Sequence, residues 1–218
     1  IYMRRGIPVS AFPANRTREG FERLKAIVPT ADIRRDSFET NFENMDMLVH
    51  PAMGLLNVGY FDRCDAAGEP SDFYGIGNTA GTGRLTEAMD AERRPVCARY
   101  GVRYRPVLEH IRNLYGCRGE TVREAVRNSP LYQGLKPIAP GVWRSWMKND
   151  IHLAHVPFVQ FAELAGETVP LNRGFVDIAD ALLGTASWED GLNLDRLGVA
   201  GMSFEQVRRY AETGEHAL

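Results

Sequence analysis

The spacing of hydrophobic and polar residues changes once along the chain. In residues 6–14, β-branched and aromatic residues mix with prolines, which is typical of a short strand ending near Pro13. Thr17 then stands where it would cap a helix over residues 18–28, and Pro29 would stop that helix. A strand followed by a helix predicts an α/β segment at residues 1–35.

From residue 36 onward, nearly every apolar pattern has the period of a helix. Glycine- and proline-rich breaks separate these patterns, and one helix contains Pro95, where we expect a kink. The predicted helices cover residues 51–61, 82–101, 105–116, 121–128, 153–166, 173–184 and 203–214. We therefore predict an all-helical domain over residues 36–218 and a mainly α fold for the chain.

Composition narrows the class of protein. The 218 residues are 44% hydrophobic, which is enough to bury a core, and the net charge of −2 gives no general attraction to nucleic acid or anionic lipid. No apolar run approaches the roughly 20 residues that span a bilayer. Three cysteines suit a reducing compartment better than a disulfide framework. We expect a cytoplasmic protein with neither nucleic acid nor membrane as partner.

Three motifs favour structural roles. The glycines in residues 75–83 match neither the G-x-G-x-x-G spacing of a dinucleotide-binding turn nor the ATPase phosphate loop that ends in Lys-Ser/Thr. We therefore expect a flexible turn there. His152 and His155 share a helix face but lack a third ligand, which favours a solvated helix and no metal. Trp143 and Trp146 are three apart, a spacing more typical of core packing than of base stacking.

His50 is the strongest candidate for chemistry. Because proline disfavours helical conformation before it and suits a first helical turn, His50 should lie at or next to a helix N-cap. The positive helix end favours neutral imidazole, whereas a carboxylate neighbour would favour imidazolium. Together these influences would suit a general acid/base. The alternative is a histidine that only caps or packs.

The neighbourhood of His50 also carries a family resemblance. Residues 44–59 follow the pattern N-x5-HP-A-x-x-LLN-x-G, which resembles the start of the helical domain of the octopine/nopaline (opine) dehydrogenase family. Further similar segments are residues 72–79, 89–102 and 149–166, and residues 8–17 resemble the last strand of the family's cofactor domain. The resemblance covers almost the whole chain.

The resemblance implies a fold and a reaction. The fold is a helical domain like the C-terminal domain of 6-phosphogluconate dehydrogenase, preceded by the last strand and helix of a Rossmann domain. The reaction is a reductive condensation, in which an amino acid and a 2-oxo acid form an imine that NADH or NADPH reduces. The expected partners are these small molecules, and a homodimer is left open.

The resemblance also implies roles for particular residues. His50 would donate and accept the proton, and Asp150 would orient its ring and stabilise its charge. Asn44 and Asn57 would bind substrate or cap a helix. Arg144 would contact a substrate carboxylate or a cofactor phosphate, or form a surface ion pair.

The chain departs from the family pattern around Asp150 and in the sequence that would bind the cofactor. Around Asp150, Asn149 replaces an acidic residue, Ile151-His152 replaces Val-Pro, and the interval from Arg144 to Asp150 is one residue longer. Moreover, the sequence has no G-x-G-x-x-G turn. We therefore expect a fragment that is inactive in isolation, with its cofactor bound mainly by sequence outside it. One alternative is a non-catalytic helical interaction or dimerisation module, and a weaker one is a dehydrogenase that reduces a simple keto group.

Overall fold

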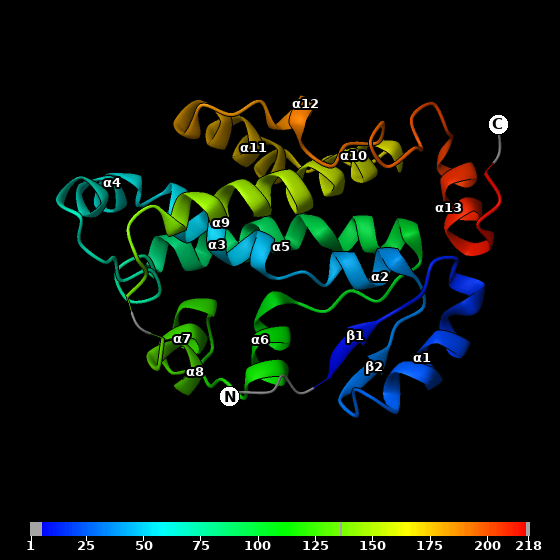
Figure 1. The fold of residues 1–218 in the computed structure, drawn as a ribbon, viewed down its shortest axis with the longest axis horizontal. Coiled ribbons are helices and arrows are strands. Elements are labelled where there is room, and N and C mark those ends of the chain that lie inside the picture. Colours follow the sequence, from blue (N-terminus) through cyan, green and yellow to red (C-terminus); the bar gives the residue numbers. More distant parts are fainter. Residues whose placement is uncertain (1–5, 136, 217–218) are drawn as a thin grey trace.

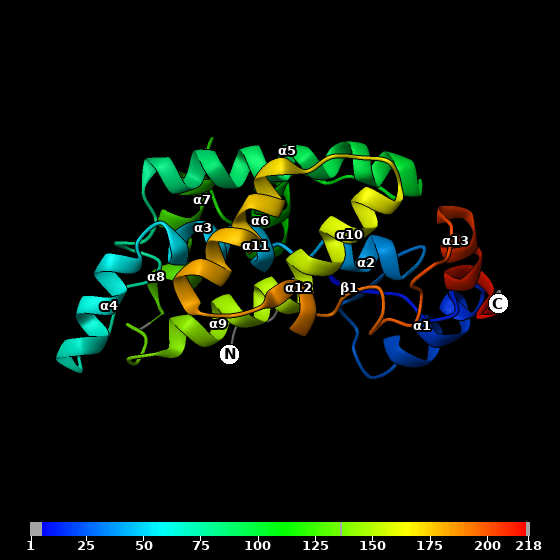
Figure 2. The same cartoon turned by 90° about the horizontal axis from the view of Figure 1, so that it is seen from above.

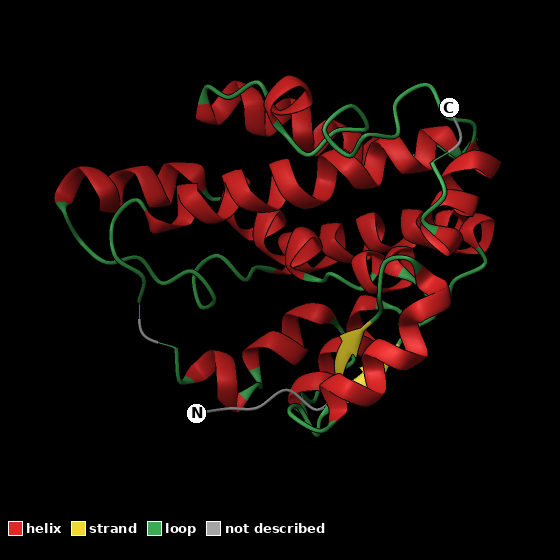
Figure 3. Cartoon of the chain, turned by 45° about the vertical axis from the view of Figure 1, so that its right-hand side comes forward, coloured by secondary structure: helices red, strands yellow, loops and turns green. Residues whose placement is uncertain are grey.

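The computed structural model describes residues 6–135 and 137–216, which form a mostly helical molecule with one small sheet (Figures 1 and 3). The prediction of a mainly helical fold after a short α/β part is confirmed. The elements are β1 (Ile7–Val9), α1 (Thr17–Lys25), β2 (Ala31–Ile33), α2 (Ser37–Phe42), α3 (Asp46–Leu55), α4 (Val58–Ala67), α5 (Ala80–Tyr100), α6 (Val107–Tyr115), α7 (Val122–Arg127), α8 (Pro130–Gln133), α9 (Val142–Asp150), α10 (Val156–Leu164), α11 (Pro170–Leu183), α12 (Ser187–Asp190) and α13 (Phe204–Thr213).

The small sheet contains two parallel strands, with Ile7 opposite Ala31, and α1 connects them. The second strand, β2, was not predicted. Residues 1–5 of the predicted α/β segment lie outside the described residues, and the domain boundary at residue 35 stays a prediction. Two adjacent arginines join this segment to the helices: Arg34 pairs with Glu43 at 2.6 Å, and Arg35 donates to the carbonyl of Tyr100 at 2.8 Å.

Thr17 does not cap α1, contrary to prediction. Arg16 occupies the cap position and makes no side-chain cap bond. The Thr17 hydroxyl instead accepts a hydrogen bond from the backbone N–H of Ala11 at 3.0 Å. The Thr17 hydroxyl therefore bonds the segment before α1, whereas local sequence rules predict that it bonds the first turn of the helix.

Helix α3 lies at the centre of the molecule. It packs against α5 and α9, and Figures 1 and 2 show it between these two helices. Most of its residues are buried because it is apolar on nearly every side. At Gly54, a Cβ atom would overlap the sulfur of Met147, so the missing side chain lets α9 approach closely.

The glycine cluster forms a turn and the start of α5. Gly75 and Gly77 precede the helix, whereas Gly81 and Gly83 lie in its first turns. Thr79 caps the helix through reciprocal hydrogen bonds with Thr82. Figure 2 shows α5 running along one side of the molecule.

Helices α9 and α10 form one continuous rod, interrupted only by a π-helical turn at Ile151–His155. Within it, the N–H of Val156 donates to the carbonyl of Ile151, five residues earlier. Pro157, which has no N–H, follows directly and disfavours a regular α-helical ladder here. The prediction of a solvated helix was wrong, because both His152 and His155 are buried.

Helix α13 returns to the α/β end of the molecule. Its Tyr210 ring packs edge-on against Phe12, which follows β1, with 5.1 Å between ring centroids. Figure 2 shows α13 beside α1 at this end. No helix among the described residues is both long and apolar enough to cross a membrane.

Candidate active site

His50 lies inside α3 and not at its start, which corrects the prediction from the His-Pro pair. The helix begins at Asp46, one turn earlier than predicted, and Pro51 lies within it. The side-chain oxygen of Asn44 accepts a hydrogen bond from the backbone N–H of Asp46 at 3.1 Å, which helps to start the helix there. Asn44 therefore makes the capping type of contact that was one of its two predicted roles.

The proline in α3 is compensated by a histidine from the neighbouring rod. Pro51 has no N–H, so the carbonyl of Met47, four residues earlier, lacks its usual intrahelical partner. The Nε2 nitrogen of His155 hydrogen-bonds this carbonyl. Complete burial lowers the pKa of His155 to about 4, so its ring is neutral at pH 7 and donates through Nε2.

The structure brings His50 and Asp150 together although they are 100 residues apart in the sequence. The Nδ1 nitrogen of His50 lies 2.9 Å from Oδ2 of Asp150, and both side chains are 15% exposed. Burial lowers the pKa of His50, but the hydrogen bond and charge of Asp150, with the charge of Asp46, outweigh it and raise the pKa above its ordinary value. His50 therefore stays protonated to a higher pH than an ordinary histidine does.

Tyr74 holds the other ring nitrogen of His50, and the sequence analysis assigned it no role. Its hydroxyl lies 2.8 Å from Nε2 of His50. Burial raises the pKa of Tyr74 well above its ordinary range, so the hydroxyl stays protonated. A phenol donates to a neutral imidazole and accepts from an imidazolium, which allows the contact in both states of His50.

Aromatic rings enclose the His50 side chain. Trp146 stacks on it, with 5.4 Å between centroids, and Phe73 meets it edge-on at 5.7 Å. Trp146 precedes Asp150 by four residues on α9, so one helix face carries both. Trp143 is fully buried, which confirms its prediction as a core residue, while Trp146 forms one wall of the site.

Two predicted substrate contacts have other partners. The Asn57 amide donates to the carbonyls of Met53 at 2.8 Å and Gly77 at 3.2 Å, which joins the end of α3 to the turn before α5. Arg144 is 43% exposed and pairs with Asp62 and with Asp65, the latter at 3.4 Å. Arg144 therefore makes the surface ion pair that was its alternative role.

The described residues do not form a complete site for a metal or a dinucleotide. They contain no group of three histidine, cysteine or acidic side chains that could hold a metal ion. A Rossmann fold carries its glycine-rich turn after its first strand, whereas residues 1–35 are predicted to be the last strand and helix of such a domain. The connection between β1 and α1 forms a short 3₁₀ turn at Ala14–Arg16 and contains no glycine. This connection does not fit the phosphates of a dinucleotide.

The sequence and the fold both match known dehydrogenases. A family model described as "NAD/NADP octopine/nopaline dehydrogenase, alpha-helical domain" matches residues 33–183. The chain belongs to this family. The resemblance inferred from the sequence is thereby confirmed, and it identifies the chain as part of an oxidoreductase family.

Relatives in this family align with most of the chain. The opine dehydrogenase of Arthrobacter sp. (strain 1C) is 26% identical over 204 residues, which cover 93% of this chain and 55% of that enzyme. Octopine dehydrogenase with NADH and L-arginine has a TM-score of 0.67 at 17% identity, over 93% of this chain and 56% of that one. Its structure with NADH and agmatine gives 0.64 at 16% identity, over 91% and 55%. This chain therefore spans about half the length of these relatives.

Proposed function

We propose that these residues form the acid/base and substrate domain of an NAD(P)-dependent opine dehydrogenase. The reaction would join an amino acid and a 2-oxo acid by reductive condensation. The contact between His50 and Asp150 carries this proposal, because family membership alone does not show that the chain retains proton-transfer chemistry. The raised pKa of His50 supports an acid that remains protonated close to neutral pH.

The proton transfers follow from the two states of His50. When the amino group of one substrate adds to the carbonyl carbon of the other, the resulting hydroxyl must take a proton before it leaves as water. Protonated His50 would supply that proton, and the Asp150 carboxylate would stabilise the charged ring beforehand. In the reverse direction, neutral His50 would take the proton back.

The hydride would come from NADH or NADPH when bound. Because the connection between β1 and α1 does not fit dinucleotide phosphates, we propose that a dinucleotide-binding domain outside these residues holds the cofactor. Without that domain, the 218 residues are expected to give no turnover.

The test of this function uses the full-length gene product that contains this chain. NADH or NADPH consumption would be followed with an amino acid, with a 2-oxo acid, and with both together. A secondary amine dicarboxylate, identified by mass spectrometry only when both substrates are present, would support the proposal. A 2-hydroxy acid formed without the amine would instead indicate a keto-group dehydrogenase, and no consumption would indicate a non-catalytic module.

Replacing Tyr74 by phenylalanine is expected to lower kcat by about tenfold without loss of folding, because Nε2 of His50 loses the group that positions it. Steady-state kinetics of the full-length protein would measure the change. Tyr132→Phe is the control, since the Tyr132 ring packs 4.7 Å from that of Tyr74 and keeps its place without its hydroxyl. Equal rates for Tyr74→Phe and the control would argue against a positioning role.

Asp150→Asn is expected to move the pH dependence of condensation toward lower pH. The Asp150 charge raises the pKa of His50, so its removal lowers that pKa and deprotonates the acid earlier as pH rises. The pH profile of kcat/KM would show the shift. Asp62→Asn, at an exposed carboxylate paired with Arg144, is the control and should leave the profile in place. If Asp150→Asn left the pH profile of kcat/KM unchanged, Asp150 would have no part in the proton transfer.

A further inference from the structure

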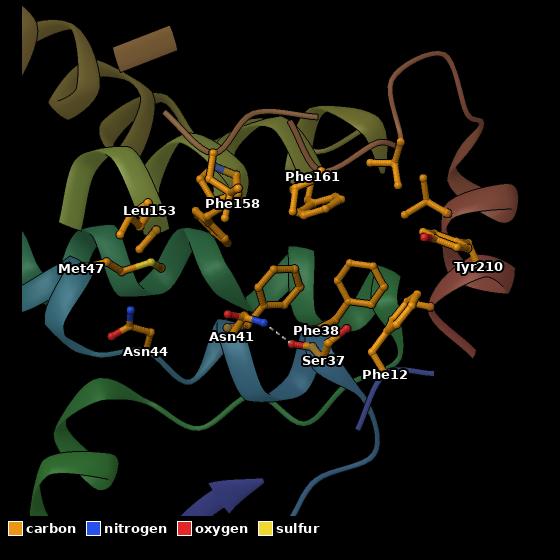
Figure 4. Close-up of a pocket in the computed structure, with 18 residues that line it drawn as sticks. Phe12, Ser37, Phe38, Asn41, Asn44, Met47, Leu153, Phe158, Phe161 and Tyr210 are labelled. Atoms are coloured by element: carbon orange, nitrogen blue, oxygen red, sulfur yellow. Dashed lines mark hydrogen bonds between the residues drawn. The ribbon is translucent and has the colours of Figure 1, made fainter. Parts of the chain in front are cut away.

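An apolar cavity of about 340 Å³ lies between α2, α10 and α13 (Figure 4). Phe38 of α2 faces Phe158 and Phe161 of α10 across it, and Phe42 of α2 also lines it. The 18 described residues that line it include none with a charged side chain. The few polar groups, among them Asn44, are amides and hydroxyls.

One end of the cavity adjoins the face of α3 that carries His50. Met47, which lines the cavity, precedes His50 by three residues in α3, and residues three apart share a helix face. Their separation along the axis is about 4.5 Å. Leu153 and Ala154, from the π-helical turn that follows Asp150 in the chain, line the same cavity. The side chain of a substrate held at His50 can therefore reach the cavity.

We propose that this cavity receives the side chain of the amino-acid substrate and that the preferred substrate has an apolar side chain. This inference rests on the proposed opine dehydrogenase function and adds the substrate class. Apolar surface gains free energy on entering such a site, whereas an ammonium, guanidinium or carboxylate loses hydration and finds no opposite charge in the lining. The volume accommodates branched and aromatic side chains.

The rim of the cavity also favours an apolar occupant. Phe12 and Leu153 are 55% and 60% exposed, although both are large hydrophobic residues that line the cavity. Exposed apolar groups around a hollow mark a surface that binds something. A solved octopine dehydrogenase binds L-arginine, a cationic amino acid. The uncharged lining distinguishes the specificity proposed here from that one.

The test compares amino acids at saturating NADH and 2-oxo acid with the full-length gene product. Values of kcat/KM would be measured for L-alanine, L-leucine, L-phenylalanine, L-arginine and L-glutamate. Each buried methylene contributes about fourfold, so leucine should exceed alanine by roughly 50-fold. Arginine and glutamate should fall about 10²-fold or more below leucine, because the lining offers neither charge a partner.

Two substitutions connect the preference to the cavity. Ala154→Leu fills part of the space and should lower kcat/KM for leucine and phenylalanine about tenfold relative to kcat/KM for alanine. Ala181→Leu makes the same change on an exposed part of α11 and is the matched control. Leu197→Glu places a carboxylate in the lining and should improve arginine relative to leucine.

The outcomes separate this inference from the proposed function. Turnover with leucine above arginine and glutamate, and its loss in Ala154→Leu but not in Ala181→Leu, would support the cavity as the side-chain site. Turnover with arginine or glutamate at or above leucine would overturn the inference and leave the dehydrogenase function intact. An apolar preference unaffected by Ala154→Leu would also overturn it, and would make the cavity a contact surface for another protein segment. No turnover with any amino acid would overturn both.

Discussion

His50→Ala is expected to lower turnover of the full-length gene product by about 10²-fold or more, with little loss of folding. The expectation follows from the position of the ring between Asp150 and Tyr74, where it is the group suited to exchange a proton near neutral pH. Steady-state kinetics with both substrates would measure it. The helix itself should persist, since alanine has a high helix propensity.

The control for His50→Ala is His216→Ala. His216 is exposed near the end of the chain, where its Nε2 hydrogen-bonds the carbonyl of Gly198 at 2.8 Å and its ring meets Tyr210 edge-on at 5.1 Å. This variant should retain full turnover. Near-normal turnover in His50→Ala, with circular dichroism unchanged in both variants, would remove His50 from the reaction.

The second large effect is expected on stability and concerns His155. Its pKa is lowered to about 4 from an ordinary 6.5, so between these values the unfolded chain binds a proton that the folded chain does not. Stability is therefore fully present above pH 6.5 and declines as pH falls toward 4, by roughly 3 kcal/mol in total. His155→Gln, which keeps an N–H donor but does not titrate, should show a weaker decline. Urea unfolding between pH 7 and pH 4 would measure both free energies.

The difference in pH dependence between the parent protein and His155→Gln isolates the contribution of His155, because the carboxylates titrate in the same range in both proteins. His216→Gln removes an exposed histidine and serves as the control, with the pH dependence of the parent protein expected. If His155→Gln lost stability with the same pH dependence as the parent, the buried neutral ring would not be the source. His50 acts in the opposite sense: its raised pKa contributes stability that is lost as pH rises through it.

Long periodic segments of the sequence predicted the main helices well. Residues 82–101 and 203–214, for example, correspond closely to α5 (Ala80–Tyr100) and α13 (Phe204–Thr213). The predicted ranges missed α2 (Ser37–Phe42) and α9 (Val142–Asp150), and they also missed the shortest pieces: β2 has three residues, and α8 and α12 have four each. Segments of three or four residues contain little more than one hydrophobic period, so packing against the rest of the chain decides their conformation.

The start of α3 could not be predicted from the His-Pro pair. The local rule holds that proline interrupts a helix because it removes a hydrogen bond. In this fold, His155 supplies a hydrogen bond to the carbonyl of Met47 from 108 residues away. A rule based on neighbouring residues has no access to that partner, and so it placed the helix start one turn too late.

The site shows the same division between local and distant information. The family resemblance named His50 and Asp150, but no pattern in the sequence pointed to Tyr74, which approaches from a turn without periodic structure. Arg144 offered a guanidinium suited to substrate, yet its acidic partners lie on α4, about 80 residues earlier. Residue type alone therefore neither identified Tyr74 nor decided the role of Arg144.

The π-helical turn sets how many residues can separate Asp150 from His155. Both side chains reach the same helix, α3, where they meet His50 and the carbonyl of Met47. In a regular α-helix, residues five apart point about 140° away from each other, so only one of them would face α3. A turn closed over five residues brings both to one side. The length of Ile151–His155 is therefore as constrained as its residue types, and gaining or losing a single residue there would rotate one contact away from the other.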